Sequence, residues 1–436
     1  MALNSLLRRV SLLALIIFTS ARSVAWGGGF FLYETGTQDV GLASAGYGAG
    51  TVDPSTLFTN PAGMTHLEGD QLMVNLQGLV PKLQFSPDSG STKTGTDGGQ
   101  ALVPLPGGSV FYEHSLTKDL KIGIGTFAYF GGALEYNLNW VGRYFLQGAT
   151  IIGQSVQPTI AYRVNKWLSV GAGPIFMIGY LREKVAINNV DPNLGDGKLK
   201  LQDWALGYGG NIGVMLEPLA DTRIGITYLT PVSLNFNPAT NFTGLGPGLT
   251  ALLLKRGLLT GSVDLGLTVP QAVTLGIFHQ FNDRFAIMGN INWQQWSHFG
   301  EVEVGVNSAD PKNLTTNLHY KDTGHIAIGG QYRPQDKWLL MAGFAFDSTM
   351  INESNRTVSA PIGSQYRYGL GAVYEYSKRL KLGFDYELQW WGNLSLTHGR
   401  GGDARGTVSG TFGDTFINFF CANVTYKFGM NSQTSN

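Results

Sequence analysis

Apolar and polar residues alternate along most of the chain from about residue 70 onwards. In "LKLGFDYELQW" (380–390), every second residue from Leu380 to Trp390 is apolar, and the intervening positions are polar, charged or Gly. The pattern recurs in "QYRYGLGAVYEY" (365–376) and in "FAIMGNINWQQW" (285–296). A period of two places the two sets of side chains on opposite faces of a β-strand. The pattern therefore predicts a chain built mainly from strands with one apolar face.

The connections between these stretches alternate between short and long. The short ones are "SLTKD" (115–119), "VNKW" (164–167), "EPLADT" (217–222), "FNDRF" (281–285), "RPQDKW" (333–338) and "YSKRLK" (376–381). Longer links begin near residues 86, 131, 183, 237, 297, 348 and 392. Tight turns at one end and long loops at the other are typical of an outer-membrane barrel, whereas a soluble sandwich has no reason to sort its loops by length.

The strands delimited by these links number about fourteen, an even count as expected for a bacterial barrel. We expect them at 70–85, 108–116, 119–130, 150–164, 167–182, 203–217, 222–236, 262–281, 284–296, 319–333, 338–348, 364–377, 380–392 and 412–428.

Composition supports a surface that meets lipid. Charged residues make up 14% of the chain, against roughly 25% in soluble proteins. Aromatic residues make up 12%, and the formal net charge of zero lacks the basic excess of a nucleic-acid-binding protein. The most apolar candidate for a spanning helix, Leu249–Leu259, is interrupted by Lys255 and Arg256. The expected fold is therefore all-β, a transmembrane antiparallel barrel that satisfies its backbone groups between strands.

The first 25 residues have the features of a secretory signal peptide. Arg8 and Arg9 precede a short apolar run at 10–18, and Ser23-Val24-Ala25 offers a cleavage site before Trp26. A short membrane anchor is the alternative. Cys421 is the single cysteine of the chain, so no intramolecular disulfide is possible.

Two further segments do not fit the strand series. Residues 26–69 contain Asp53-Pro54 and Asn60-Pro61, and each pair is typical of a capped helix start. A fourteen-strand barrel is wide enough to need filling, so we expect 26–69 to form a plug in the lumen and 70–428 to form the barrel. A loose periplasmic tail is the alternative.

The second segment, the loop 238–260, contains the Leu249–Leu259 stretch, which predicts an amphipathic helix that either catches an apolar substrate or packs on the barrel rim.

Candidate catalytic and metal-binding patterns are weak. The seven histidines are scattered without ligand spacing. Ser297 and His298 are adjacent, and neighbouring strand residues face opposite sides, which argues against a catalytic pair. We therefore expect no enzyme activity, no cofactor and no metal site.

The stretch "GGGFFLYETGTQDVGLASAGYGAGTVDPSTLFTNPAGMT" (27–65) resembles the N-terminal hatch of the FadL/TodX family, the outer-membrane transporters of long-chain fatty acids and other hydrophobic compounds. Its core is the hatch motif Asn60, Pro61, Ala62 and Gly63. "WVGRYFLQG" (140–148) and "PTIAYRVNKWLSVGAGP" (158–174) are similar to the strand-turn-strand region of the family. A departure is the tail 429–436, "GMNSQTSN", which follows the aromatic on which such barrels usually end.

The resemblance implies a monomeric barrel, in contact with outer-membrane lipid and lipopolysaccharide, that works without energy coupling. Hydrophobic ligand would be captured by the outer loops, bind beside the hatch and leave sideways through a kink in the third strand. The residues that this assigns are Phe30, Phe31, Tyr33, Arg143 and Tyr144 for ligand binding, Leu252, Leu253 and Leu254 for the outer capture groove, and Gly131 and Gly132 for the kink. Arg143 could pair with a carboxylate or serve as a structural ion-pair partner, and the two glycines could equally mark an ordinary strand end.

The favoured function is passive uptake of long-chain fatty acids or similar hydrophobic molecules. Uptake of aromatic hydrocarbons, a general diffusion porin and a surface receptor stay open as alternatives.

Overall fold

The computed structural model describes residues 30–35, 37–50, 53–189, 191, 193–307, 312–399 and 405–428. The predicted signal peptide (1–25), the predicted mature start at Trp26 and the tail 429–436 lie outside these residues. Among the described residues, no helix is long and apolar enough to cross a membrane.

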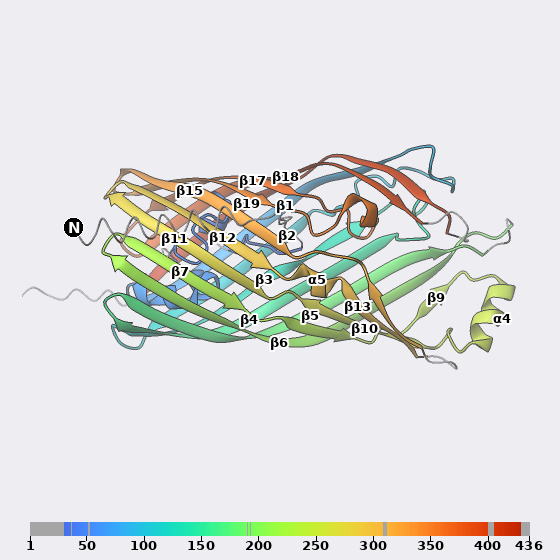
Figure 1. The fold of residues 1–436 in the computed structure, drawn as a ribbon, viewed down its shortest axis with the longest axis horizontal. Helices are drawn as coiled ribbons and strands as arrows, with labels where there is room; N and C mark the ends of the chain where they lie inside the picture. The colour runs from blue at the N-terminus through green and yellow to red at the C-terminus, as the bar shows by residue number, and fades with distance from the viewer. Residues whose placement is uncertain are drawn as a thin grey trace, which may run out of the picture.

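Fourteen antiparallel strands form a closed barrel (Figure 1). Around the ring the order is β5, β4, β3, β2, β1, β19, β18, β17, β16, β15, β12, β11, β7 and β6. Pairing of β6 with β5 closes the ring. The predicted fold class and strand number are therefore confirmed. The barrel strands are β1 (Asp70–Pro87), β2 (Leu105–Ser115), β3 (Leu120–Glu135), β4 (Gly148–Asn165), β5 (Leu168–Ile187), β6 (Gly197–Leu219), β7 (Thr222–Leu229), β11 (Ala272–Asn282), β12 (Phe285–Gln294), β15 (Thr323–Gln335), β16 (Trp338–Asp347), β17 (Gln365–Glu375), β18 (Leu380–His398) and β19 (Val408–Phe428).

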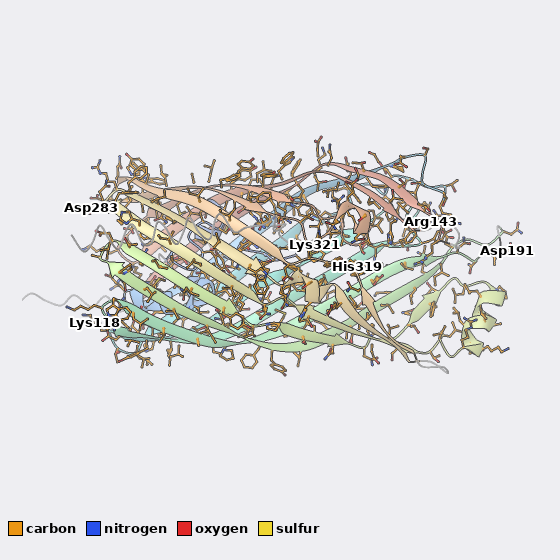
Figure 2. All side chains as sticks on the ribbon, viewed as in Figure 1. Lys118, Arg143, Asp191, Asp283, His319 and Lys321 are labelled. Atoms are coloured by element: carbon orange, nitrogen blue, oxygen red, sulfur yellow. The ribbon has the colours of Figure 1, made fainter. Side chains whose placement is uncertain are left out.

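Each wall strand has an apolar outer face and a more polar inner face. On β6, Trp204, Leu206 and Tyr208 are exposed, whereas Asn211 on the inner side is fully buried. The two ends of the barrel also differ: Lys118 and Asp283 mark the end with short turns, and Arg143 and Asp191 mark the opposite end (Figure 2). This is the pattern of a barrel whose outer surface meets lipid.

Two predicted strands, 222–236 and 262–281, are each broken at a proline. β7 ends at Leu229 before Pro231, and β11 begins only after Pro270. Proline has no N–H to donate to the ladder, so pairing in the wall stops there. The displaced pieces, β8 (Val232–Phe236) and β10 (Ser262–Val269), join β13 (Glu301–Asn307) and β14 (Lys312–Asn317) in a separate four-stranded sheet.

The separate sheet packs against the inner side of the barrel wall. A Cβ added to Gly179 or Gly207 would lie within 3 Å of Leu234 on β8. Gly207 alternates with the lipid-facing residues of β6, so Leu234 lies on the lumen side. Next to this sheet, α5 (Trp296–Phe299) contacts β10 and β13 and contributes two buried aromatic rings.

Residues 30–69, here called the inner segment, lie inside the barrel towards the end with short turns (Figure 1). They contain α2 (Thr37–Gly41), α3 (Thr56–Thr59) and η1 (Pro61–His66). As predicted, Asn60 caps η1: its Oδ1 accepts from the Ala62 N–H at 3.0 Å, and Pro61 takes the first helical position. The cap predicted at Asp53 is wrong, because α3 begins at Thr56 and Asp53 instead accepts from the Ser55 N–H.

Asn60 also ties the inner segment to the wall. Its Nδ2 donates to the Gly48 carbonyl at 2.7 Å and to the Val214 carbonyl of β6 at 3.1 Å. A Cβ on Gly213 would lie 2.0 Å from Asn60 Oδ1, and a Cβ on Gly225 would lie 1.8 Å from the Gly48 carbonyl. Glycine at these wall positions lets the two backbones approach.

The predicted outer-loop helix is α4 (Pro247–Lys255), which ends four residues before the expected Leu259. None of its residues is buried, and it lies beyond the barrel at the end with long loops (Figure 1). Two small elements complete the outer half, β9 (Asn241–Thr243) beside β6 and η2 (Glu353–Asn355).

The β3 strand is irregular at its middle. Its register with β4 shifts between Ala128 and Phe130, and Gly131 has a φ of +145°. Gly131 and Gly132 both stay paired with β4, through Ile152 and Ile151. The irregularity therefore bends β3 without detaching it from β4.

We predict that Gly131→Ala lowers the free energy of unfolding by about 1–3 kcal/mol, because only glycine adopts this backbone conformation without strain. An added Cβ would also lie 2.6 Å from the Ile151 carbonyl. Gly132→Ala is the matched control: its Cβ would meet only Phe30, at 3.8 Å. Urea unfolding in lipid vesicles, followed by tryptophan fluorescence, measures both, and equal midpoints for the two variants would contradict the prediction.

Candidate ligand cavity and wall gap

The barrel wall contains a gap between β2 and β3. The ladder between these strands runs from Ser115–Lys121 to Val110–Thr126 and stops there, although β2 begins at Leu105 and β3 continues to Glu135. Pairing resumes further on, where the Val103 N–H donates to the Ala133 carbonyl at 3.2 Å. Residues 127–132 thus lie beside β2 without a ladder for about 20 Å, at about 3.3 Å per residue.

The inner segment pairs with the free edge of β3 at this gap. The Leu32 N–H donates to the Tyr129 carbonyl at 2.9 Å, and the Gly131 N–H donates to the Phe30 carbonyl at 3.1 Å. Phe31 and Phe130 form an antiparallel bridge. Backbone groups that β2 leaves unpaired are therefore satisfied from inside the lumen.

A cavity of about 380 Å³ adjoins the gap. Residues from both faces of the wall line it: Ser109 and Phe127 are buried on the lumen side, whereas Gly108 and Gln154 are exposed on the lipid side. The cavity therefore extends through the wall. Most of its lining is apolar, and Glu34 is the only charged residue among the described residues that line it.

Aromatic rings surround the lumen side of the cavity. Phe30 lies 6.4 Å from Phe130, 6.1 Å from Trp296 and 5.9 Å from Phe299, measured between ring centroids. Contacts of this kind stabilise the cluster beyond the area that it buries. Phe30 of the inner segment thus connects the bent part of β3 with α5.

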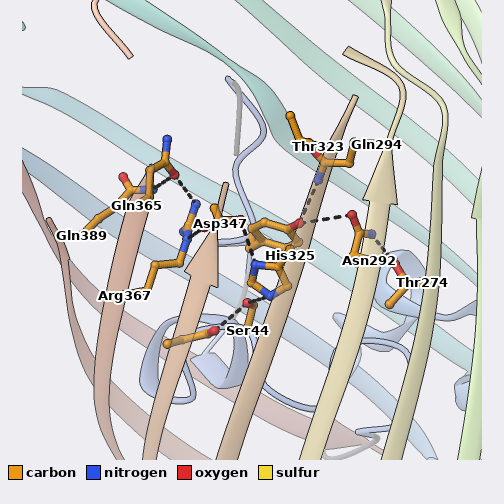
Figure 3. Close-up of polar contacts among 12 residues, drawn as sticks. Ser44, Thr274, Asn292, Gln294, Thr323, His325, Asp347, Gln365, Arg367 and Gln389 are labelled. Carbon is orange, nitrogen blue, oxygen red and sulfur yellow. Dashed lines mark hydrogen bonds and ion pairs between the residues drawn. The ribbon is translucent and has the colours of Figure 1, made fainter. Parts of the chain in front are cut away.

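A buried charge network centres on Arg367 and Asp347 (Figure 3) and includes Glu34, which lines the cavity. Arg367 on β17 pairs with Glu34 of the inner segment, with Asp347 Oδ2 at 2.6 Å and with Glu387 Oε1 at 3.1 Å. His325 Nδ1 lies 2.8 Å from Asp347 Oδ1. Three carboxylates thus share one guanidinium and one imidazole, and all five side chains are almost completely buried.

Tyr33 and Ser44 extend this network through the inner segment. The Tyr33 ring stacks on His325 at 4.4 Å between centroids, and the Gln294 amide donates to the Tyr33 hydroxyl at 2.8 Å. Ser44 Oγ lies 2.8 Å from His325 Nε2. Burial raises the pKa of the Tyr33 phenol well above its ordinary value, and the Asp347 carboxylate adds to this effect, so the phenol stays neutral.

The structure places the sequence-predicted ligand residues in three separate regions. Phe30 and Phe31 line the cavity, whereas Tyr33 lies beneath it in the polar network. Arg143 and Tyr144 lie in the outer loops, away from the cavity, and both bind Asp196: Arg143 Nε at 2.7 Å and the Tyr144 hydroxyl at 2.6 Å. This is the arrangement expected of a structural ion pair.

The contacts with Asp196 also affect the pKa of the Arg143 guanidinium. Burial alone would lower the pKa of this guanidinium, but the hydrogen bonds and charges of Asp196 and Tyr144 together outweigh it, and the net pKa is raised. Leu252, Leu253 and Leu254 lie on α4, far from the cavity, and Leu252 and Leu254 are exposed.

Several residues of the cavity and the network were not predicted from the sequence. Glu34, Gln365, Arg367 and Trp391 come from the inner segment, β17 and β18. The strand alternation does place Arg367 on the face opposite Tyr366 and Tyr368, so the sequence could have predicted an inward-facing charge there. It could not have predicted the partners of Arg367, because they come from segments far apart in the sequence.

A family model described as outer membrane protein transport protein (OMPP1/FadL/TodX) matches residues 18–428. The chain belongs to this FadL/TodX family. It is thus an outer-membrane protein of a family that transports hydrophobic compounds. Its relatives include outer membrane protein P1 of Haemophilus influenzae, 26% identical over 85% of this chain and 88% of that protein. The long-chain fatty acid transport protein of Escherichia coli is 24% identical over 81% of this chain and 86% of that protein.

Solved FadL/TodX structures share the fold. A Pseudomonas aeruginosa FadL homologue superimposes with a TM-score of 0.82 at 22% identity, over 92% of this chain and 100% of that one. The P. putida toluene transporter TodX gives a TM-score of 0.65 at 16% identity, over 94% and 100%. The predicted family, outer-membrane location and barrel are therefore confirmed.

We predict that Arg367→Gln lowers the free energy of unfolding by about 3–5 kcal/mol, because it leaves buried carboxylates without their cation. Arg143→Gln is the matched control: it removes a partly exposed pair and is expected to cost at most about 1 kcal/mol. Urea unfolding of both variants in lipid vesicles measures the difference. Similar losses in the two variants would show that the buried network does not stabilise the fold.

Proposed function

We propose that this protein takes up small hydrophobic compounds passively, from the lumen cavity through the gap between β2 and β3 into the membrane. The observation that carries this proposal is a single cavity lined from both faces of the wall. An apolar solute leaving by this route enters lipid without crossing water. Because the apolar surface of the solute stays out of water throughout, the hydrophobic effect does not oppose its release.

The lining of the cavity favours neutral substrates over ionised ones. An ionised carboxylate needs a cation when it leaves water, and the described lining contains no Lys, Arg or His. Monoaromatic hydrocarbons, for which the solved channel CymD is named, carry no charge and match the mostly apolar lining.

Long-chain fatty acids, named for the E. coli relative, are the second candidate substrate. The apolar lining draws on β1 to β4 and on β17 to β19, which gives a long chain room. The acid would have to enter protonated or keep its head outside the described cavity.

For the inner segment we propose the role of a plug. Its α3 and most of η1 are buried, and η1 contacts β4, β5 and β6. A general diffusion porin would need an open lumen, and this segment lies inside the barrel at the end with short turns (Figure 1).

We predict that Ala128→Trp lowers uptake about tenfold or more, because residue 128 lines the cavity at the gap and a tryptophan would fill it. Ala422→Trp is the control. Ala422 pairs with Phe384 and Leu76, whose exposed side chains lie on the lipid face. Initial uptake of radiolabelled toluene and oleate, in host cells lacking their own transporter, is the measurement. Unchanged uptake by Ala128→Trp at equal surface expression would refute exit through the gap.

We also predict that deleting residues 30–63 converts the closed barrel into a steady pore in planar bilayers. The full-length protein should show little conductance under the same conditions. Heat-modifiable migration on a gel checks that the shortened barrel has folded. A folded deletion variant that stays closed would exclude the plug role.

A further inference from the structure

Three buried side-chain atoms of residues that line the cavity have no hydrogen-bond partner: Gln77 Oε1, Gln365 Nε2 and Trp391 Nε1. Gln365 is 1% exposed. Buried polar groups are nearly always paired, so three unpaired atoms around one cavity indicate a ligand that pairs with them.

Hydrogen bonds to neighbouring side chains decide which atom of Gln365 stays unpaired. Gln365 Oε1 accepts from Arg367 Nη2 at 3.2 Å and from Gln389 Nε2 at 2.6 Å, which leaves its amide N–H₂ free (Figure 3). Glu34, by contrast, is held by Arg367 and is hydrogen-bonded to Glu387. Gln365 and Trp391 each lie next to the Tyr366–Trp390 pair of β17 and β18. The two donors therefore come from neighbouring strands.

This set comprises two donors, Gln365 Nε2 and Trp391 Nε1, and one acceptor, Gln77 Oε1. A hydroxyl group has one O–H to donate and two lone pairs that accept, so its hydrogen-bonding capacity matches this set. An alkane or plain arene satisfies none of them. An ionised carboxylate only accepts, and it would face Glu34 together with the surplus of carboxylates around Arg367.

We propose that this cavity selects amphiphiles with a neutral hydroxyl head, that is, alcohols or phenols with an apolar body. The proposal deepens the proposed uptake function and rests on it. The apolar lining around Phe30 and Phe130 would hold the body of the ligand, while the three unpaired atoms would bind its hydroxyl.

The test compares three probes that share a ten-carbon body: decan-1-ol, decane and decanoate at pH 8. Each displaces an apolar fluorescent probe from the full-length protein in detergent. Trp391→Phe removes one donor and keeps an aromatic ring. Trp204→Phe, at a tryptophan exposed on the lipid face, is the matched control.

We expect Trp391→Phe to weaken decan-1-ol about tenfold while leaving decane within about twofold, since tenfold corresponds to the loss of one well-made hydrogen bond. Trp204→Phe should change neither. The selectivity proposal is overturned if Trp391→Phe leaves decan-1-ol unchanged, if it weakens decane equally, or if decanoate binds more tightly than decan-1-ol. If none of the three compounds displaces the probe, the proposed uptake function itself fails.

Discussion

The fold depends on the need of every backbone polar group in lipid to find a partner within the protein. The fourteen-strand ladder meets most of this need around the ring, and it is interrupted at Pro231 and Pro270 and where β2 and β3 part after Val110–Thr126. There Phe30 and Leu32 take over part of the pairing with β3 from inside the lumen. An opening in the wall is therefore compatible with a stable barrel only because a segment from outside the ladder supplies the missing partners.

The same segment is held in place by charge. Glu34, three residues after Phe31, joins Arg367 with Asp347 and Glu387, while Tyr33 stacks on His325. Each of these partners lies on a different wall strand, so any displacement of the inner segment would separate a buried ion pair. The network thus couples the position of Phe30 at the gap to the wall on the far side of the cavity.

The cavity between these two features has an unusual balance of chemistry. Apolar side chains dominate its lining, yet it contains one carboxylate and several amide and indole groups. Arg143, the cation that sequence reasoning offered to a carboxylate head, is instead bound to Asp196 in the outer loops. The described lining thus favours neutral ligands, and a polar end that hydrogen-bonds without charge would fit it best.

The sequence by itself determined the fold class, the strand number and the membrane location, because period-two alternation and loop lengths are local properties of the chain. It indicated the family through the resemblance of residues 27–65. It also predicted the cap at Asn60, which needs only residues 60–62. It missed the interruption of two predicted strands, 222–236 and 262–281, because Pro231 and Pro270 break the ladder within stretches that still look apolar and alternating. The ligand cavity, the wall gap and the buried network were decided only by the tertiary structure. Their members, such as Glu34 and Arg367, are hundreds of residues apart, and only closure of the barrel around the inner segment brings them together.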